Sequence, residues 1–380
     1  MTNPDTAPAA PGRRKPWAAR LRKLLWLLRT VDVDEIAGLI GQFDARLQQV
    51  EQSQRQIQAM LAEAHDRIEA ILQPPDTRIN LASNLNIKNL GYELGRSLAE
   101  ASLAGRPVRQ DHRRLHSKLC TQDDFATDWL RYWCDELRTA PLFHRKIWEL
   151  CYVAQALFAA GQLAAGRRGI GFGCGEEPLP SLFAKYGARV LATDLDPADP
   201  QAEIWRLTSQ HAHAVETLRR PDICPDHELL GNIDFQTLDM NAIPRALDGQ
   251  FDFCWSTCAL EHLGTIENGL RFIENALATL KKGGIAVHTT EFTINDGATI
   301  DNHPIVLYQR RHLESLADGL HAAGHEVAEF DFNPGNGIMD RFVDLPPFSG
   351  NELIAPQHSA HLKLLFDGYT CTSVGIIITA

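Results

Sequence analysis

One glycine-rich stretch constrains the fold of this chain more than any other feature of its sequence. Glycine occupies every second position of it, at Gly169, Gly171, Gly173 and Gly175. A segment with the pattern of a β-strand leads into these glycines, and a segment with the pattern of a helix follows them. Glycine lets the backbone turn sharply and lets a ligand approach without meeting a Cβ atom. The stretch therefore predicts a strand–loop–helix unit that holds a ligand at its loop.

Predicted strands and helices alternate along the chain from this point onward. The strands cover residues 168–172, 189–193, 233–238, 250–256, 284–291, 325–332 and 371–379. The helices cover residues 179–186, 200–219 and 264–281, and a helical, aromatic segment precedes them at 123–165. Alternation at this spacing indicates βαβ units. We therefore expect an α/β fold with a doubly wound, mostly parallel, Rossmann-like seven-stranded sheet, whose last two strands form an antiparallel edge.

An acidic residue closes the second of these strands. Asp194 stands 19 residues after Gly175, at the carboxyl end of a strand, where a carboxylate can accept hydrogen bonds from both hydroxyls of a ribose. A glycine-rich turn followed by a strand-end acid predicts a cofactor that contains adenosine.

Two further acids narrow the choice of cofactor. Glu176 stands where a dinucleotide-binding loop would carry its third glycine, and Glu177 follows it. Both acids suit the positive end of a helix dipole, but they would repel a pyrophosphate bound at the same place. S-adenosylmethionine has no phosphate and carries an ammonium and a sulfonium group. The loop therefore favours S-adenosylmethionine over NAD.

With these motifs, residues 144–380 resemble the class I S-adenosylmethionine-dependent methyltransferases. Further matches to that family lie at Leu238–Pro244, Phe251–Ser256, Ala259–Leu263 and Leu280–Gly284, in the expected order. The resemblance implies a Rossmann-like domain that binds S-adenosylmethionine. The residues that it assigns to the cofactor are Gly171, Gly173, Gly175, Glu176, Asp194, Asp239, Met240 and Ser256.

The sequence departs from that family in two places. The family usually carries an acid two residues before the glycine that matches Gly171, where the acid contacts the methionine ammonium. This chain has Gly169 at that position. Glu176 or Glu177 is the expected substitute. The fourth strand ends in Ser256–Ala259 and lacks the motif of enzymes that methylate amino groups of nucleic acids. Its absence argues against a DNA base as the acceptor.

Two side chains are the expected catalytic residues. An oxygen nucleophile must lose its proton, and His262, at the carboxyl end of the fourth strand, is the expected base. The alternative for His262 is that it only orders the loop or the cofactor. Glu291, at the end of the fifth strand, is the second candidate. No metal site is expected, because the chain has no CxxC pair and no HExxH motif.

Two segments outside the common motifs are expected to determine the acceptor. His144–Glu149 precedes the first strand of the sheet and is expected to cover the cofactor or the substrate, or else to be a solvated helix. Residues 293–312 form a polar insertion that suits a hydroxyl-rich acceptor such as a sugar, although a solvated loop would look the same.

A seven-residue apolar repeat characterises the N-terminal part of the chain. From Val33 to Ile71 the a and d positions are apolar except for Gln54. This repeat predicts a coiled coil that joins copies of the chain, and the alternative is a long amphipathic helix folded onto its own domain. Pro74–Pro75 is expected to end the helix.

Four regions are therefore expected. Residues 1–30 are basic and partly disordered, residues 31–73 form the coiled coil, residues 74–122 are a linker with short helices, and residues 123–380 are the methyltransferase domain with its helical cap.

Charge is distributed unevenly over these regions. Residues 1–30 contain seven Lys and Arg residues and one Asp, a balance of +6, so the other residues must sum to −17 to give the net charge of −11. An acidic body argues against a nucleic-acid partner. Residues 13–30 could contact an anionic membrane, or could simply begin a solvated helix. Eight scattered cysteines without a pairing pattern indicate a cytoplasmic protein, with association at the inner face of the membrane left open.

The sequence as a whole predicts an S-adenosylmethionine-dependent methyltransferase. The expected reaction is O-methylation of a small or glycan-type acceptor, for example in surface polysaccharide or glycolipid assembly. Two other classes stay open: an NAD-dependent oxidoreductase on a Rossmann-like fold, and a non-catalytic coiled-coil scaffold whose domain senses the cofactor.

Overall fold

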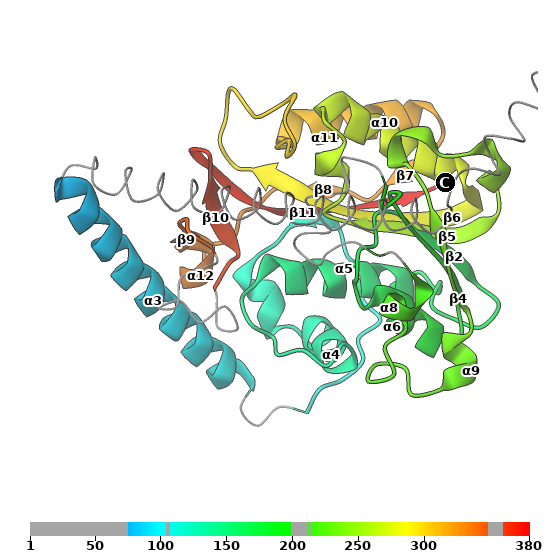
Figure 1. Ribbon diagram of the computed structural model, residues 1–380, viewed down its shortest axis with the longest axis horizontal. Coiled ribbons are helices and arrows are strands. Elements are labelled where there is room, and N and C mark those ends of the chain that lie inside the picture. The colour runs from blue at the N-terminus through cyan, green and yellow to red at the C-terminus, as the bar shows by residue number, and fades with distance from the viewer. Residues whose placement is uncertain (1–74, 104–106, 199–211, 213, 349–359) are drawn as a thin grey trace, which may run out of the picture. The chain divides into compact units, whose positions relative to one another are not determined.

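A twisted, mostly parallel β-sheet forms the centre of the described structure, and helices pack on it (Figure 1). The computed structural model describes residues 75–103, 107–198, 212, 214–348 and 360–380. Five parallel strands form the main part of the sheet, in the order β4–β3–β2–β5–β6. They are β2 (Arg168–Gly171), β3 (Arg189–Asp194), β4 (Ile233–Thr237), β5 (Phe251–Thr257) and β6 (Leu280–Thr293). This order turns outward in both directions from β2 and β5, so the doubly wound sheet is confirmed.

The last strand runs antiparallel, as the sequence predicts. β11 (Tyr369–Thr379) pairs with β6 from Cys371↔Thr293 to Thr379↔Ile285. It is not the edge of the sheet, because its other side is covered by three short strands in succession. They are β10 (Lys363–Phe366), β1 (Ser117–Leu119) and β7 (Glu326–Val327).

This shared edge explains why the predicted strand at 325–332 is broken. β1 pairs with Val374 and Gly375 of β11, and β7 pairs with Ile378 and Thr379. β8 (Phe330–Asp331) pairs with β1 instead of β11, and β9 (Val343–Asp344) pairs with β10. Within the described residues the sheet therefore has eleven strands, where seven were expected.

Helices cover both faces of the sheet (Figure 1). α10 (Ile266–Ala278) and α11 (Arg310–Ala322) lie on one face, and α4 (Asp128–Glu136), α5 (Arg145–Ala159) and α6 (Leu179–Lys185) lie on the other. The shorter helices are α8 (Val215–Leu218), α9 (His227–Leu230) and α12 (Ile338–Arg341), with 3₁₀ turns at Gln122–Ala126, Met240–Ala242, Arg245–Leu247 and Leu260–His262. Most of the predicted helix at 200–219 lies outside the described residues.

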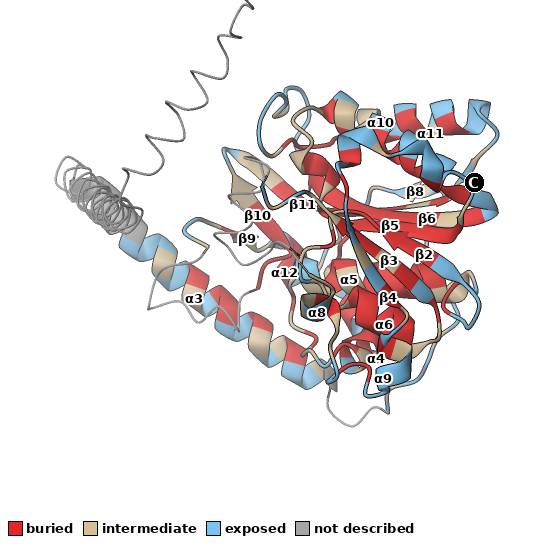
Figure 2. Cartoon of the chain, turned by 45° about the vertical axis from the view of Figure 1, so that its right-hand side comes forward, coloured by how far each residue is buried: buried red, intermediate tan, exposed pale blue. Residues whose placement is uncertain are grey.

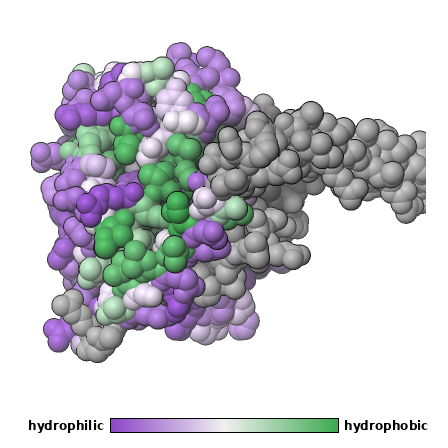
Figure 3. Space-filling view, turned by 90° about the vertical axis from the view of Figure 1, so that its left-hand side faces the viewer, coloured by the Kyte–Doolittle hydropathy of each residue, from purple (hydrophilic) through white to green (hydrophobic). Residues whose placement is uncertain are grey.

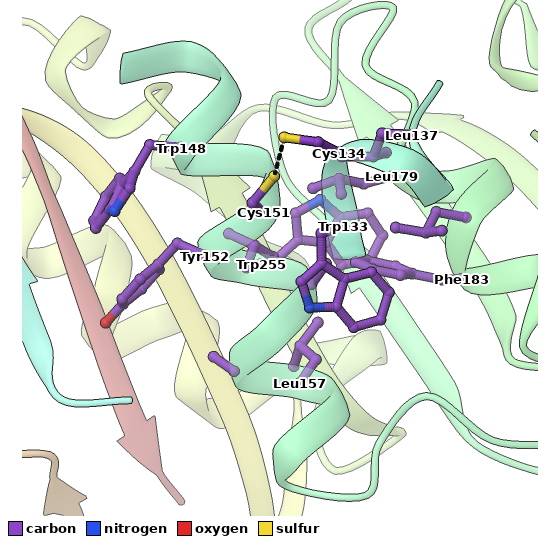
Figure 4. Close-up of a cluster of buried hydrophobic side chains, with 14 of the residues drawn as sticks. Trp133, Cys134, Leu137, Trp148, Cys151, Tyr152, Leu157, Leu179, Phe183 and Trp255 are labelled. Carbon is purple, nitrogen blue, oxygen red and sulfur yellow. Dashed lines mark hydrogen bonds between the residues drawn. The ribbon is translucent and has the colours of Figure 1, made fainter. Parts of the chain in front are cut away.

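The aromatic segment at 123–165 forms the α4–α5 layer and supplies much of one core (Figure 4). Trp133, Trp148 and Tyr152 from this layer are fully buried, and Trp255 and Phe183 meet them from the sheet and α6. Burying an aromatic or large aliphatic side chain of this kind contributes about 1.5–3 kcal/mol to stability. The layer is therefore fixed firmly to the sheet, which matters because α5 begins at the candidate site.

The region 74–122, expected to be a linker with short helices, is different. It contains one long helix, α3 (Pro75–Leu103), followed by the strand β1. Four asparagines and two glycines give this segment a poor helix propensity, but its inner face is held by tertiary contacts. Lys88 donates to the carbonyls of Leu345 and Pro347 at 2.6 and 2.8 Å and pairs with Asp344 at 2.8 Å. Figure 2 shows buried and exposed residues alternating along α3.

The basic region 1–30 and the predicted coiled coil 31–73 lie outside the described residues, so both stay predictions. Among the residues that the structure describes, no helix has the combination of length and apolar character needed to span a membrane.

Candidate active site

A cavity of about 1440 Å³ opens at the carboxyl ends of the parallel strands. This is the edge at which open α/β sheets bind their ligands. The loops after β2, β3, β4 and β5, the start of α5 and residues 302–304 all contribute to its wall. The predicted site residues that line it are Gly173, Gly175, Glu176, Asp194, Asp239, Met240 and His262.

The glycine-rich turn takes the conformation that only glycine adopts easily. Gly173 and Gly175 have φ values of +60° and +52°, a region that is costly for residues with a Cβ. A Cβ on Gly173 would also stand 2.8 Å from the Cβ of Ala259. Gly171 has a different role from the one expected. It does not line the cavity, and its missing side chain makes room for the Trp255 ring and the Cys174 sulfur.

Asp194 connects the two loops that meet at the cavity. Its Oδ2 accepts from the backbone N–H of Gly175 at 3.0 Å and of Ala212 at 3.1 Å, and its Oδ1 accepts from Leu195 at 2.8 Å. Hydrogen bonds from backbone N–H groups favour an ionised carboxylate. The acid expected at the end of the second strand is therefore in place on the cavity wall.

The two acids after the glycines differ in position. Glu176 is exposed at the cavity, whereas the Glu177 carboxylate turns back toward β5. Glu177 accepts from Trp255 Nε1 at 2.6 Å and from the Thr257 hydroxyl. Burial raises the pKa of Glu177 to about 7, against hydrogen bonds that lower it. A side chain that lines the cavity and titrates near neutrality is a candidate functional group.

Two predicted site residues lie behind the cavity wall. Ser256 is fully buried, and its hydroxyl lies 2.8 Å from Nδ1 of His288. Glu291 does not line the cavity but forms a buried ion pair with Arg145. A position near the end of a strand therefore did not predict a place on the cavity wall for Ser256 and Glu291, because their side chains point into the protein.

His262 lies on the cavity wall in a defined tautomer. Its Nδ1 is 2.9 Å from the carbonyl oxygen of Pro304. Because a carbonyl can only accept, Nδ1 carries the proton, and in the neutral ring the basic lone pair is on Nε2. Burial lowers the pKa of His262 despite the nearby carboxylate of Glu261. The ring is therefore neutral at pH 7 and able to accept a proton.

The start of α5 adds charged groups that the sequence motifs did not assign. Lys146 and Glu149 line the cavity, and Lys146 Nζ lies 3.2 Å from Glu149 Oε2. Behind them Arg145 Nη1 contacts Glu149 Oε1 at 3.1 Å, while its Nη2 pairs with Glu291. The segment His144–Glu149, expected to cover the site, contributes to its wall. No motif identifies Arg145 as the partner of Glu291, which lies 146 positions away in the sequence.

Cys258, Glu261 and Glu291 form a compact, buried group beside Arg145. Their potential ligand atoms lie within 4.8 Å of one another. Arg145 already supplies positive charge here, since it pairs with Glu291 and its Nη1 lies 3.6 Å from Cys258 Sγ. The positive charge of Arg145 therefore compensates the negative charge of this group, and we assign no metal to it.

The cavity fits a cofactor that contains adenosine. Gly173 and Gly175 form a tight turn on its wall, Asp194 offers a carboxylate, and Leu238 and Met240 offer apolar surface. All three features line the same cavity, as binding of a nucleoside requires.

Comparison with known proteins agrees with this geometry in part of the chain. Residues 170–288, about a third of the chain, match a family model described as a methyltransferase domain. This segment includes the end of β2, the strands β3 to β5, the turn at Gly173–Gly175, Asp194 and His262. The match supports the class I methyltransferase family and S-adenosylmethionine as the cofactor. A search of curated proteins finds no match.

Solved structures with a similar fold include several methyltransferases. Phosphoethanolamine N-methyltransferase 2 of Haemonchus contortus is 16% identical, with a TM-score of 0.31 over 45% of this chain and 36% of its own. Magnesium protoporphyrin IX methyltransferase of Synechocystis is 13% identical, with a TM-score of 0.33 over 60% and 81%. The [4+2]-cyclase SpnF is 19% identical, with a TM-score of 0.32 over 47% and 60%.

This chain thus spans less than two thirds of the length of some of these proteins.

Proposed function

We propose that this protein is an S-adenosylmethionine-dependent methyltransferase that methylates an oxygen of a small or glycan-type acceptor. One observation carries the proposal: a single cavity is lined both by the turn and acid of an adenosine site, Gly173–Gly175 and Asp194, and by a neutral histidine, His262. The match of residues 170–288 to a methyltransferase domain supports the same reaction class.

Residues of the glycine-rich side bind and orient the cofactor in this proposal. Asp194 accepts from the ribose hydroxyls, and Leu238, Asp239 and Met240 contact the base. Glu177 lines the cavity and would replace the acid missing at Gly169, with the lone pairs that Trp255 and Thr257 leave free accepting from the cofactor's ammonium group. When bound, S-adenosylmethionine supplies a methyl group activated by a sulfonium. The protein then contributes chiefly by positioning, which can account for several orders of magnitude in rate.

His262 accepts the acceptor's proton. Its Nδ1–H is held by the Pro304 carbonyl, which fixes the ring so that Nε2 is the base. A hydroxyl acceptor hydrogen-bonded to Nε2 would give up its proton there as its oxygen takes the methyl group. A base whose pKa lies below 7 is correctly ionised for this step at neutral pH.

The wall around His262 supports a polar acceptor. Lys146, Asn268, Asn302 and His303 all line the cavity on the elements that surround this histidine. Amide, ammonium and imidazole groups offer both donors and acceptors, as a molecule with several hydroxyls requires. The expected polar insertion at 293–312 supplies two of these four side chains.

Calorimetric titration of the full chain tests the cofactor first. S-adenosylmethionine and S-adenosylhomocysteine should bind in the micromolar range, and NAD should not. Asp194→Ala should weaken both by at least about tenfold, since it removes a charged hydrogen-bond acceptor. Asp248→Ala, an exposed acid that does not line the cavity, is the control. Binding of NAD alone would favour an oxidoreductase, and binding of none of these ligands would contradict the proposal.

Transfer of a labelled methyl group tests the acceptor and the base. Incubation with labelled S-adenosylmethionine and a panel of glycans, small alcohols and amines should label hydroxyl compounds. His262→Ala should reduce transfer by about 10²–10⁴-fold and leave S-adenosylhomocysteine binding unchanged. In the unsubstituted protein, protonation of His262 should remove the base and reduce transfer only at a pH more acidic than the ordinary titration range of histidine, because burial lowers the pKa of this residue. Full transfer by His262→Ala would show that this residue only orders the loop.

A further inference from the structure

Large hydrophobic side chains are exposed on one helix outside the cavity. Among the described residues, α3 carries three of the five most exposed ones: Ile87 at 59%, Leu90 at 72% and Leu94 at 42% exposure. None of them lines the cavity. Figure 3 views the molecule from the side on which α3 lies, and hydrophobic residues gather there. Contiguous exposed apolar surface on a soluble protein commonly marks an interaction site.

These three side chains form one stripe. Their spacing of three and four residues places them on the same face of a helix. The face that packs on the domain is a different one and contains Lys88, Tyr92 and Ala99. Helix α3 therefore has two apolar faces, of which its own domain covers only one. We call Ile87, Leu90 and Leu94 the α3 stripe.

The position of the stripe in the chain indicates what covers it. The apolar heptads of Val33–Ile71 end four residues before Pro75, the first residue of α3. Such heptads need a facing helix, and the axes of paired helices lie 8–10 Å apart. If two copies pair in parallel through the heptads, the two Pro75 residues are brought together. Each α3 then begins beside the α3 of the other copy.

We propose that the α3 stripe packs against the same stripe of a second copy of this chain. The contact has its own register. Continuing the heptads from Val33 would place Asn89 and Tyr92 at the interface, but Tyr92 is buried in its own domain. The two prolines at 74 and 75 interrupt the heptads, so α3 presents residues 87, 90 and 94 instead. The proposal rests on the predicted coiled coil and is independent of the enzymatic activity.

Cysteine cross-linking of the full chain tests this contact directly. All eight native cysteines are buried, so Leu90→Cys introduces the one readily accessible thiol within the described residues. Around a two-fold axis residue 90 meets its own counterpart, and a disulfide forms when the two Cα atoms lie within about 7 Å. Mild oxidation should therefore give a covalent dimer on a non-reducing gel.

Glu100→Cys is the matched control. Residue 100 is also exposed on α3, but it lies on the face where Arg96 pairs with Glu93 and Glu100. It should cross-link at least about tenfold more slowly than Leu90→Cys at the same protein concentration. Equal rates for the two variants, or no cross-link at residue 90, would overturn the proposal.

Sedimentation equilibrium provides the second measurement. Leu90→Glu combined with Leu94→Glu should weaken self-association of the full chain by at least about tenfold, because charges would face each other across the contact. Ile338→Glu changes a hydrophobic residue on α12 that is 48% exposed and should have no effect. Circular dichroism and S-adenosylhomocysteine binding report whether each variant is folded.

Two results of that measurement would overturn the inference. Unchanged association in the double variant would mean that the heptads alone join the copies. The second result would be a native chain that sediments as a monomer, together with a Leu90→Cys variant whose new thiol is protected from thiol reagents. These two observations would mean that residues 33–71 fold back onto α3. Neither result would affect the proposed methyltransferase activity.

Discussion

Gly169 illustrates how one missing side chain reshapes the site. The resemblance to class I methyltransferases predicts an acid at this position, but here a Cβ would stand only 2.2 Å from the Phe253 ring. Phe253 is fully buried on β5 and packs against Phe183 and Trp255. A carboxylate therefore has no room at residue 169. The core next to the sheet takes that space, and an acid on the other side of the turn, Glu177, is available instead.

The packing at Gly169 predicts a specific loss of stability. Gly169→Ala should reduce the free energy of unfolding by about 1–3 kcal/mol, because the added methyl overpacks the core. Gly319→Ala should have the opposite effect. Gly319 lies in the interior of α11 with no atom within 4 Å of an added Cβ, so the substitution should raise the free energy of unfolding by about 0.5–1 kcal/mol. Urea unfolding followed by tryptophan fluorescence measures both, and a neutral Gly169→Ala would contradict the packing argument.

Glu177 predicts that cofactor binding depends on pH. Burial raises the pKa of its carboxyl to about 7, so at pH 6 the group is mostly protonated and neutral. A bound ammonium favours the ionised form, and binding below pH 7 must therefore release a proton. The affinity for S-adenosylhomocysteine should rise between pH 6 and pH 8, by at most about tenfold per pH unit. Titrations in buffers of different ionisation enthalpy would measure the proton released.

The Glu177→Gln variant separates this role from a structural one. It should abolish the proton release and weaken S-adenosylhomocysteine binding at pH 8 by roughly 10-fold or more, the cost of losing a charged hydrogen bond. 5′-Methylthioadenosine lacks the amino acid portion and should bind the variant as well as the native protein. If both ligands weaken equally, Glu177 acts by holding Trp255 and Thr257 and not by contacting the ammonium.

At the scale of elements, the start of α5 is fixed to the sheet by buried charges. Arg145 pairs with Glu149 on its own helix and with Glu291 on β6, and Ser373 on β11 accepts from its Nη1 at 3.2 Å. Burial alone would raise the pKa of Glu149, but Lys146 and Arg145 together lower it below its ordinary value. A helix that contributes Lys146 and Glu149 to the cavity is thus positioned by one guanidinium group.

Removal of that guanidinium should be costly. Arg145→Met leaves the buried Glu291 without its charged partner and leaves Glu149 with Lys146 alone, so it should destabilise the domain by about 3–5 kcal/mol. Adding Glu291→Leu removes the unpaired carboxylate and should restore at least about 1 kcal/mol of the loss. Thermal and urea unfolding of the single and double variants provide the comparison. Additive losses would show that Arg145 and Glu291 do not stabilise each other.

At the scale of the whole molecule, the chain joins an α/β domain to a predicted coiled coil. The heptads predict that Leu47→Asp combined with Leu61→Asp, both at a positions, weakens self-association by at least about a hundredfold, since each charge would be buried. Gln48→Asp with Gln56→Asp changes solvent-facing b and c positions and is the control. Sedimentation of the full-length variants measures the difference. Equal association of the two pairs would contradict a coiled coil in this register.

Much of the sheet could be predicted because its strands carry a strong local signal. β5 is buried along almost its whole length and reads in the sequence as a mostly apolar run, interrupted by Asp252. β1, β9 and β10 have no such signal, being two to four residues long. β1 and β10 form by pairing with β11, and β9 forms by pairing with β10. Helix α3 was missed for a related reason, since long-range contacts of Lys88 and Tyr92 outweigh its poor propensity.

Local sequence was enough to name three of the residues that line the cavity. Glycines at a sharp turn and an acid at a strand end are set by local backbone geometry, so Gly173, Gly175 and Asp194 could be named from their spacing alone. Tertiary packing set the rest. It turned Ser256 and Glu291 inward, aimed Glu177 at β5, placed Lys146 and Glu149 on the cavity wall and left the α3 stripe exposed. Such contacts join residues far apart in the chain, so a local sequence pattern cannot predict whether a side chain points into the core or toward the cavity.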